Sequence, residues 1–260
     1  MIKRIIFLLL LVCFICCGCV KKEVPKDDLT KILERGKIIV GVRDDTAPFG
    51  FRDEKGNLIG YDIDLAKHIA KGILGSEKKI EFVPVTASNR IIKLSSGEVD
   101  ILVATMSITN NRLQILNFSA PYYYAGQAIL INKSSKMTSL RDFQGKRLIV
   151  VFGSTSEGTL RTNVPEVEVI GFKTYRDAYK ALKSGKAEGL VADDSILMNY
   201  EAKDNSVKVL PKRYSKEPYA VAVRKESDSD RLLESIDYVI ENLQSTGKLF
   251  RMQEKWKLKN

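Results

Sequence analysis

Short apolar runs alternate with amphipathic stretches along most of this chain, and the alternation predicts β-strands followed by α-helices. Residues 38–42 (IIVGV) form a compact apolar run that predicts a buried strand. Residues 62–74 carry apolar side chains on one helical face, which predicts a helix. The same pattern predicts further strands at 80–85, 99–104, 148–152, 167–172 and 187–192, and helices at 89–95, from 156 and at 175–184. Alternating elements of this kind are typical of an α/β protein with mostly parallel sheets.

Two segments of the chain repeat one another. Residues 93–104 (KLSSGEVDILVA) and 181–192 (ALKSGKAEGLVA) are identical at six of twelve positions. Each segment has the pattern of a helix end, a tight glycine turn and a buried strand. A chance match between two ordinary turns is one explanation of the repeat. The other is that the chain forms two similar α/β lobes, which we expect.

The first nineteen residues differ in character from the rest of the chain. A basic start at Lys3 and Arg4 precedes an apolar run over 5–15. This run is about half of the roughly 20 apolar residues that a membrane-spanning helix needs, so the pattern predicts a secretion signal. The segment also holds all the cysteines of the chain, which are Cys13, Cys16, Cys17 and Cys19. The folded part therefore has no cysteine available for a disulfide.

The end of this segment, Cys16-Cys17-Gly18-Cys19, resembles the bacterial lipoprotein signal. In that signal a small residue precedes a cysteine that is lipidated and becomes the new N-terminus. The resemblance implies a signal peptide at 1–18, a lipid on Cys19 and a polar tether over 19–28. Cleavage and release of an unlipidated chain is the alternative.

Composition and charge narrow the classes of partner. The chain is 44% hydrophobic and 28% charged, which is ordinary for a globular protein of one large or two small domains. Its net charge of +10 would attract a polyanion, so nucleic acid has to be considered as a partner. The basic residues are scattered among acidic ones instead of gathering on one helix with stacking aromatic residues, so we expect no nucleic acid. The single histidine, His68, cannot by itself form a metal site or a catalytic triad, and we expect no metal and no cofactor.

Polar residues follow three of the predicted strands at the end where open parallel sheets bind ligands. One strand leads into 105–109 (TMSIT) and then Arg112, and its repeat leads into Asp193. The strand at 148–152 leads into 153–156 (GSTS). A guanidinium group is suited to bind a carboxylate, and an aspartate pairs with an ammonium group. A zwitterion therefore fits between these residues.

The chain from about 29 to 258 resembles the bacterial extracellular solute-binding proteins of family 3, the receptors of ABC importers for polar amino acids. No single matching stretch is specific, but together they are. The stretches are GKIIVGVRDDTAPFGF (36–51), GYDIDLAKHIA (60–70), VTASNRIIKLSSGEVDILVATMSITNNR (85–112), FSAPYYYAGQ (118–127) and GKLFRMQEKW (247–256).

The resemblance implies a two-lobed periplasmic-binding-protein fold of type II. Each lobe is expected to hold a mostly parallel sheet flanked by helices, with two crossover strands as the hinge, near 123–127 and near 214–219. Lobe 1 is then discontinuous and comprises 29–124 with 218–260, while lobe 2 comprises 125–217.

The resemblance also implies a ligand site in the cleft between the lobes. The residues that match are Thr105, Met106, Ser107, Arg112, Thr155, Ser156 and Asp193. Arg112 is expected to clamp the α-carboxylate of the ligand and Asp193 to receive its α-ammonium group. Asp194 takes that role if the register shifts by one residue. For Arg112 and Asp193 the alternative is a surface salt bridge.

Two further arginines bear on the side chain of the ligand. Arg43 and Arg90 look like the basic residues of relatives that take acidic amino acids, so glutamate or aspartate is the preferred ligand. Asp44 and Asp45 stand next to Arg43 and are able to neutralise it, and glutamine or a basic amino acid remains open. Phe49 and Tyr61 are expected to wall the pocket, or else to pack in the core of the first lobe.

The resemblance therefore implies a monomeric, non-enzymatic receptor, lipid-anchored outside the cytoplasmic membrane, in the periplasm or on the outer face of the cell. Its partners are an amino acid and an ABC permease with its ATPase. One alternative is an enzyme on the same scaffold, similar to cyclohexadienyl dehydratase. Another is the sensor module of a receptor kinase.

Overall fold

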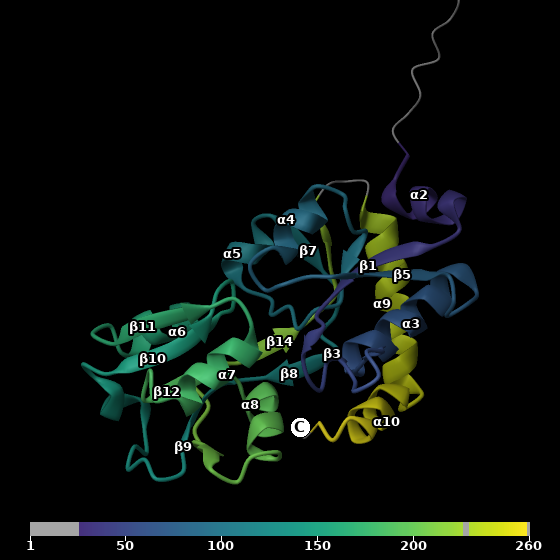
Figure 1. Ribbon diagram of the computed structural model, residues 1–260. Helices are drawn as coiled ribbons and strands as arrows, with labels where there is room; N and C mark the ends of the chain where they lie inside the picture. The colour runs from purple at the N-terminus through teal and green to yellow at the C-terminus, as the bar shows by residue number, and fades with distance from the viewer. Residues whose placement is uncertain (1–25, 226–228, 259–260) are drawn as a thin grey trace, which may run out of the picture.

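Two five-stranded β-sheets flanked by helices form two lobes in the computed structural model, which describes residues 26–225 and 229–258 (Figure 1). The expected two-lobed α/β fold is thereby confirmed. The predicted signal peptide, Cys19 and most of the tether lie outside the described residues. Within the described part of the chain, no helix has the length and apolar character needed to cross a membrane.

The first sheet contains the first predicted strand at its interior. Its order is β5 (Ile80–Pro84), β1 (Ile38–Val42), β6 (Ile101–Leu102), β15 (Ala222–Arg224) and β7 (Leu116–Phe118). Strand β1 pairs in parallel with β5 and β6, whereas β15 is antiparallel to β6 and β7. Ile38, Val40 and Val42 of β1 are fully buried and Ile39 is partly buried, as the run of Ile and Val predicts.

The second sheet has the same plan. Its order is β11 (Glu168–Phe172), β10 (Arg147–Val151), β12 (Gly189–Asp193), β9 (Gln127–Asn132) and β13 (Val207–Val209). Strand β10 is parallel to β11 and β12, and β9 is antiparallel to β12 and β13. The two segments that repeat in sequence supply β6 and β12, which occupy corresponding positions next to β1 and β10.

Two crossover strands connect the lobes. β8 (Tyr123–Ala125) and β14 (Glu217–Tyr219) pair antiparallel in a separate small sheet. β9 follows β8 and β15 follows β14, so each of these strands enters its lobe from the other one. For this reason β9 and β15 run against the other four strands of their sheets, which are mixed but mostly parallel.

Helices cover both sheets. Those around the first sheet are α2 (Asp28–Arg35), α3 (Tyr61–Leu74), α4 (Arg90–Ser95), α5 (Asn110–Leu113), α9 (Asp230–Ser245) and α10 (Lys248–Lys255). Those of the second lobe are α6 (Ser156–Asn163), α7 (Tyr175–Lys183), α8 (Asp194–Glu201) and the 3-10 turn η1 (Leu140–Phe143). The C-terminal helices α9 and α10 return to pack against α3 (Figure 1). A three-stranded hairpin sheet of β2 (Asp45–Thr46), β3 (Gly50–Arg52) and β4 (Leu58–Ile59) lies between β1 and α3 in the chain.

One predicted strand is shorter than its pattern indicates. The apolar run 99–104 forms a strand only at Ile101–Leu102. Just beyond it Thr105 has a φ of 47°, a left-handed conformation that is rare for a β-branched residue. This turn ends the strand and directs the following polar residues into the space between the lobes.

Candidate functional site

A small, largely enclosed cavity lies between the two lobes. The residues that line it are Arg43, Ala87, Arg90, Thr105, Ser107 and Arg112 from the first lobe, and Ser154, Thr155, Tyr175 and Asp193 from the second. Most of them stand directly after the carboxyl ends of β1, β6, β10 and β12, where parallel strands present their loops. The two lobes therefore jointly build one polar, buried cleft.

Arg112 connects the lobes across this cavity. It lies on α5, a short helix whose first turn is capped by the hydroxyl of Thr109. Its Nη1 donates to the carbonyl of Ser107 at 2.8 Å, and its Nη2 donates to the carbonyl of Gly153 in the opposite lobe at 3.1 Å. Burial lowers the pKa of Arg112, against the attraction of Glu217 and Asp193. The side chain is fixed with its cationic group inside the cleft.

Arg90 lies beside Arg112 and is almost wholly buried. Its Nη1 donates to the carbonyls of Ala104 and Thr105, the second at 3.1 Å, and its Nη2 donates to the Gly153 carbonyl at 3.4 Å. Its Nε is buried and has no hydrogen-bond partner within the described chain. Burial and the neighbouring arginines lower the pKa of Arg90 to about 9. The Nε–H of this cavity-lining residue is thus left without a hydrogen-bond partner in the described chain.

Asp193 provides the anionic side of the cleft. Its carboxylate accepts hydrogen bonds from Gln127 Nε2 and from the hydroxyl of Tyr219. Burial, together with repulsion from Glu217, raises its pKa to about 7. Asp194, the alternative proposed from the sequence, instead pairs with Arg213 at 2.6 Å and does not line the cavity.

Arg43 follows β1 and is already neutralised by a neighbour. Its Nη2 lies 2.6 Å from Oδ1 of Asp45, and its Nε donates to the same oxygen at 3.0 Å. The guanidinium group also lies over the ring of Tyr175, 5.5 Å from its centre. Arg43 therefore lines the cavity as half of a buried ion pair.

Seven of the eleven residues expected from the sequence meet at this cavity. They are Arg43, Arg90, Thr105, Ser107, Arg112, Thr155 and Asp193. Four others do not line it. Phe49, Tyr61, Met106 and Ser156 are each wholly buried in the protein interior.

The aromatic wall expected from Phe49 and Tyr61 is replaced by a packed cluster at the hinge. The Phe49 ring lies 5.3 Å from the rings of Tyr123 and Tyr219, edge to face. The Tyr61 hydroxyl donates to the carbonyl of Tyr122 at 2.9 Å. These residues stabilise the crossover region, which corresponds to the core-packing alternative stated for them.

Met106 and Ser156 are displaced from the cavity by local geometry. Met106 lies between two cavity-lining residues and points the opposite way, into an apolar cluster with Leu102 and Leu116. Ser156 is the first residue of α6, and its hydroxyl is buried away from the cavity.

Three lining residues were not expected from the sequence: Ala87, Ser154 and Tyr175. Tyr175 starts α7 and reads as an ordinary core aromatic residue. The carbonyl of Gly153 accepts hydrogen bonds from both Arg90 and Arg112. Apart from its place in a polar turn, nothing in the sequence indicates this role. Each of these roles depends on how closely the opposite lobe approaches.

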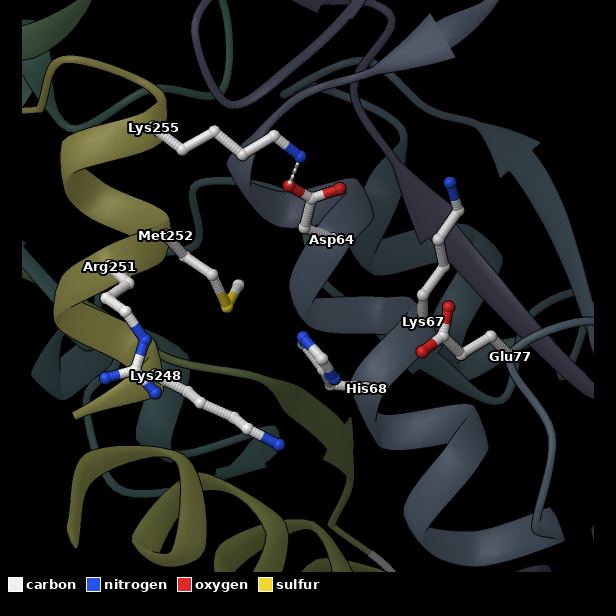
Figure 2. A pocket seen from close by; sticks show the side chains of 8 residues that line it. All are labelled: Asp64, Lys67, His68, Glu77, Lys248, Arg251, Met252 and Lys255. Carbon is white, nitrogen blue, oxygen red and sulfur yellow. Dashed lines mark hydrogen bonds and ion pairs between the residues drawn. The ribbon is translucent and has the colours of Figure 1, made fainter. Parts of the chain in front are cut away.

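Larger hollows lie on the outer surface of the protein. One, between α3 and α10, is shown in Figure 2 and is lined by Asp64, Lys67, His68, Glu77, Lys248, Arg251, Met252 and Lys255. Lys255 pairs with Asp64 at 2.6 Å. None of the charged side chains that line this hollow is buried. Among the described residues no group of three potential metal ligands occurs. The interlobe cavity, with its buried charges, is therefore the candidate functional site.

The chain is similar to several known proteins. The pattern of the bacterial extracellular solute-binding proteins, family 3, matches residues 38–259. The ABC transporter glutamine-binding protein GlnH of Bacillus subtilis is 38% identical over 241 residues, which cover 92% of this chain and 88% of that protein. A glutamine-binding protein of Geobacillus stearothermophilus is 42% identical over 201 residues, covering 76% of this chain and 77% of its own.

A more distant relative and a solved structure are also similar to this chain. A glutamate/aspartate import solute-binding protein of Salmonella typhimurium is 27% identical over 239 residues, covering 88% of this chain and 78% of that protein. The structure of an ancestral arginine-binding protein bound to glutamine superposes with a TM-score of 0.80 at 39% identity. That match covers 86% of this chain and 99% of the ancestral protein.

Proposed function

This chain belongs to the bacterial extracellular solute-binding proteins of family 3, and on that premise we propose that it delivers glutamine to an ABC importer. It is a binding protein for an amino acid and not an enzyme, as its relatives are. The proposal concerns which amino acid it takes. Its relatives named for glutamine are more similar to it than the relative named for glutamate and aspartate.

The α-groups of any amino acid find complementary charges in the cleft. Arg112 offers N–H donors to an α-carboxylate, and Asp193 offers an acceptor to an α-ammonium group. The two residues come from different lobes, so a ligand held by both bridges the lobes and stabilises the closed form. These contacts do not discriminate between side chains.

The observation that favours a neutral side chain is the ion pair of Arg43 with Asp45. From the sequence, Arg43 was expected to neutralise a second carboxylate on the ligand. Because Asp45 already holds this guanidinium group, a second ligand carboxylate would be buried without that partner, at a cost of several kcal/mol. The preference for glutamate or aspartate is therefore replaced by the alternative, glutamine.

Arg90 supplies the contact that an amide side chain needs. Its Nη groups already make three hydrogen bonds to backbone carbonyls, and its buried Nε has no hydrogen-bond partner among the described residues. One such donor suits the single carbonyl oxygen of a glutamine amide. Satisfying it removes the penalty of a buried, unpaired polar group.

We expect glutamine to raise the melting temperature of the mature protein more than any other of the twenty amino acids. A ligand that binds only the folded state stabilises it in proportion to the logarithm of its excess over Kd. A thermal-shift screen followed by calorimetry on the strongest ligands measures this. A larger shift with glutamate or with arginine contradicts the glutamine proposal and keeps the receptor class. No shift with any amino acid contradicts both, and prephenate and arogenate turnover are then the assays to run.

Closure of the lobes is expected to depend on Gly153. A Cβ at this position would lie 2.4 Å from the carbonyl oxygen of Ala87 in the opposite lobe. We expect Gly153→Ala to weaken glutamine binding by about tenfold or more, because the closed form becomes strained while the open form does not. Calorimetry measures the affinity.

Gly145 provides the matched control for this substitution. It has a φ of 67°, close to the 78° of Gly153, but no atom lies within 4 Å of a Cβ built there. Gly145→Ala therefore introduces the same backbone strain without the contact between lobes. Equal effects of the two substitutions would show that backbone strain, not closure, causes the loss.

The family places the protein outside the cytoplasm and implies permease partners. The lipid on Cys19, the individual permease with its ATPase and the monomeric state remain predictions. Release of the protein from membranes by Cys19→Ala would test the anchor.

A further inference from the structure

Asp62 is a wholly buried carboxylate beneath the cleft that does not line it. It lies in the first turn of α3. Its Oδ2 accepts the backbone N–H of Thr105 at 2.9 Å, and its Oδ1 accepts the hydroxyl of Tyr122 at 3.0 Å. Asp62 thus has two hydrogen-bond donors but no direct ion pair. Burying an ionised carboxylate costs free energy unless a positive charge lies nearby, so the source of that charge has to be found.

The missing countercharge lies on the other side of one short backbone segment. Asp62 holds the N–H of Thr105, while Arg90 donates to the carbonyls of Ala104 and Thr105. The segment at 104–105 is therefore clamped between an anion and a cation, and this clamp supports the left-handed φ of Thr105. Asp62 and Arg90 face each other through this segment.

The charge of Asp62 acts on the cations of the cleft. Burial raises its pKa to about 6, and the hydrogen bonds of Thr105 and Tyr122 with the charges of Arg90 and Arg43 oppose that rise. The carboxyl group is thus mainly ionised at neutral pH. Since Arg43 is paired with Asp45, the charge of Asp62 offsets Arg90 from beneath the cleft, as Asp193 does from the opposite lobe.

Resting on the proposed function, we propose that Asp62 determines the charge class of the ligand without touching it. By cancelling the charge of Arg90, it leaves a donor that recognises a neutral amide and gives a second carboxylate no net attraction. Asp62 is a positioning and specificity-determining residue, whereas Arg90 contacts the ligand.

The test is the ratio of the affinities for glutamate and glutamine, measured by calorimetry on wild-type protein and on Asp62→Asn. The asparagine carbonyl still accepts the Thr105 N–H, so the clamp remains while the charge is lost. We expect the glutamate-to-glutamine ratio to rise by about tenfold or more. A purely structural role of Asp62 would weaken both ligands alike, and a ratio unchanged within about twofold overturns the proposal.

Asp100 supplies the matched control. It is another buried carboxylate of the first lobe, and it accepts the backbone N–H of Ile39 at 2.7 Å and a contact from Arg35. It lies at the opposite end of β1 from Arg43. Asp100→Asn is expected to lower stability and leave the ratio unchanged. An equal change of ratio in both variants also overturns the proposal.

A second measurement applies if Asp62→Asn does not fold. The same ratio is followed on wild-type protein from about pH 7.5 to about pH 5.5, a range in which free glutamate keeps its side-chain charge. The groups facing Asp62 are Arg90 from α4, Arg43 after β1, Tyr122 before β8 and the Thr105 N–H. The pKa of Arg90 is about 9 and burial raises the pKa of Tyr122, so neither group titrates in this range. Asp193 also interacts with Arg90 and has a pKa of about 7, so the same ratio is followed in parallel on Asp193→Asn, which removes that titration. A ratio that rises on acidification supports the proposal, and a flat ratio overturns it.

The outcomes separate this inference from the proposed function. If wild-type protein prefers glutamate, the glutamine proposal fails, while a further gain for glutamate in Asp62→Asn still supports the role of Asp62. If wild-type protein binds neither ligand, both proposals fall. Glutamine preference in the wild type with no change of ratio overturns the role of Asp62 alone.

Discussion

Replacing Arg112 by alanine is expected to weaken glutamine binding by about 100- to 1,000-fold. The cavity is buried, so removal of the guanidinium group leaves the α-carboxylate of the ligand without its partner, at a cost of about 3–4 kcal/mol. The substitution also removes the hydrogen bond to the Gly153 carbonyl that links the two lobes in the closed form. Calorimetry on the mature protein measures the loss.

Two further variants define the role of Arg112. Arg112→Lys keeps the charge but not the fork of donors, and is expected to lose less than the alanine variant. Arg161→Ala removes an arginine on α6 that pairs only with exposed Glu157 on the surface, and should leave affinity unchanged. Wild-type affinity in Arg112→Ala would rule out its assignment as the carboxylate clamp.

Replacing Asp193 by asparagine is expected to weaken glutamine binding by about 100-fold and to remove a pH dependence. Asparagine keeps the shape of the side chain but loses the charge that attracts the α-ammonium group. Asp194→Asn is the matched control, because Asp194 pairs with Arg213 outside the cavity. The control variant should stay within about fivefold of wild type.

The pH dependence follows from the pKa of about 7 that burial gives Asp193 in the ligand-free protein. An ammonium group beside the carboxylate lowers this pKa, so binding releases a proton. The contribution to affinity is therefore full above pH 7 and is lost as the pH falls through about 7, by up to about tenfold per pH unit. Calorimetry over this range should show the slope in wild type and its absence in Asp193→Asn. A slope of the same size in the variant would assign the proton to another group.

The pattern of strands and polar strand ends allowed the central pair of the site to be predicted. Arg112 and Asp193 come after β6 and β12, the two strands whose sequences repeat. Parallel strands place such residues at one edge of a sheet, so local sequence is enough to locate them. Met106 was wrongly included with its neighbours because a left-handed Thr105 sets which residues of that loop face the cavity.

The roles of Arg43, Tyr175 and Gly153 were beyond the reach of sequence reasoning. Arg43 looked free to bind a ligand carboxylate, but whether Asp45 neutralises it depends on the turn of the β2–β3 hairpin sheet. Tyr175 and Gly153 matter only because the second lobe closes on the first. Contacts between lobes involve residues with no local pattern in common.

The sequence by itself indicated the α/β class, the two similar lobes, the family resemblance and the polar strand ends that line the interlobe cavity, because these depend on periodicity and on short motifs. The tertiary structure alone decided which charges remain available to a ligand. Asp62 and Thr105 are 43 residues apart, and Arg90 and Gly153 are 63 apart. Electrostatic compensation acts through space inside a buried cleft, so the net charge that a ligand meets depends on these long-range contacts.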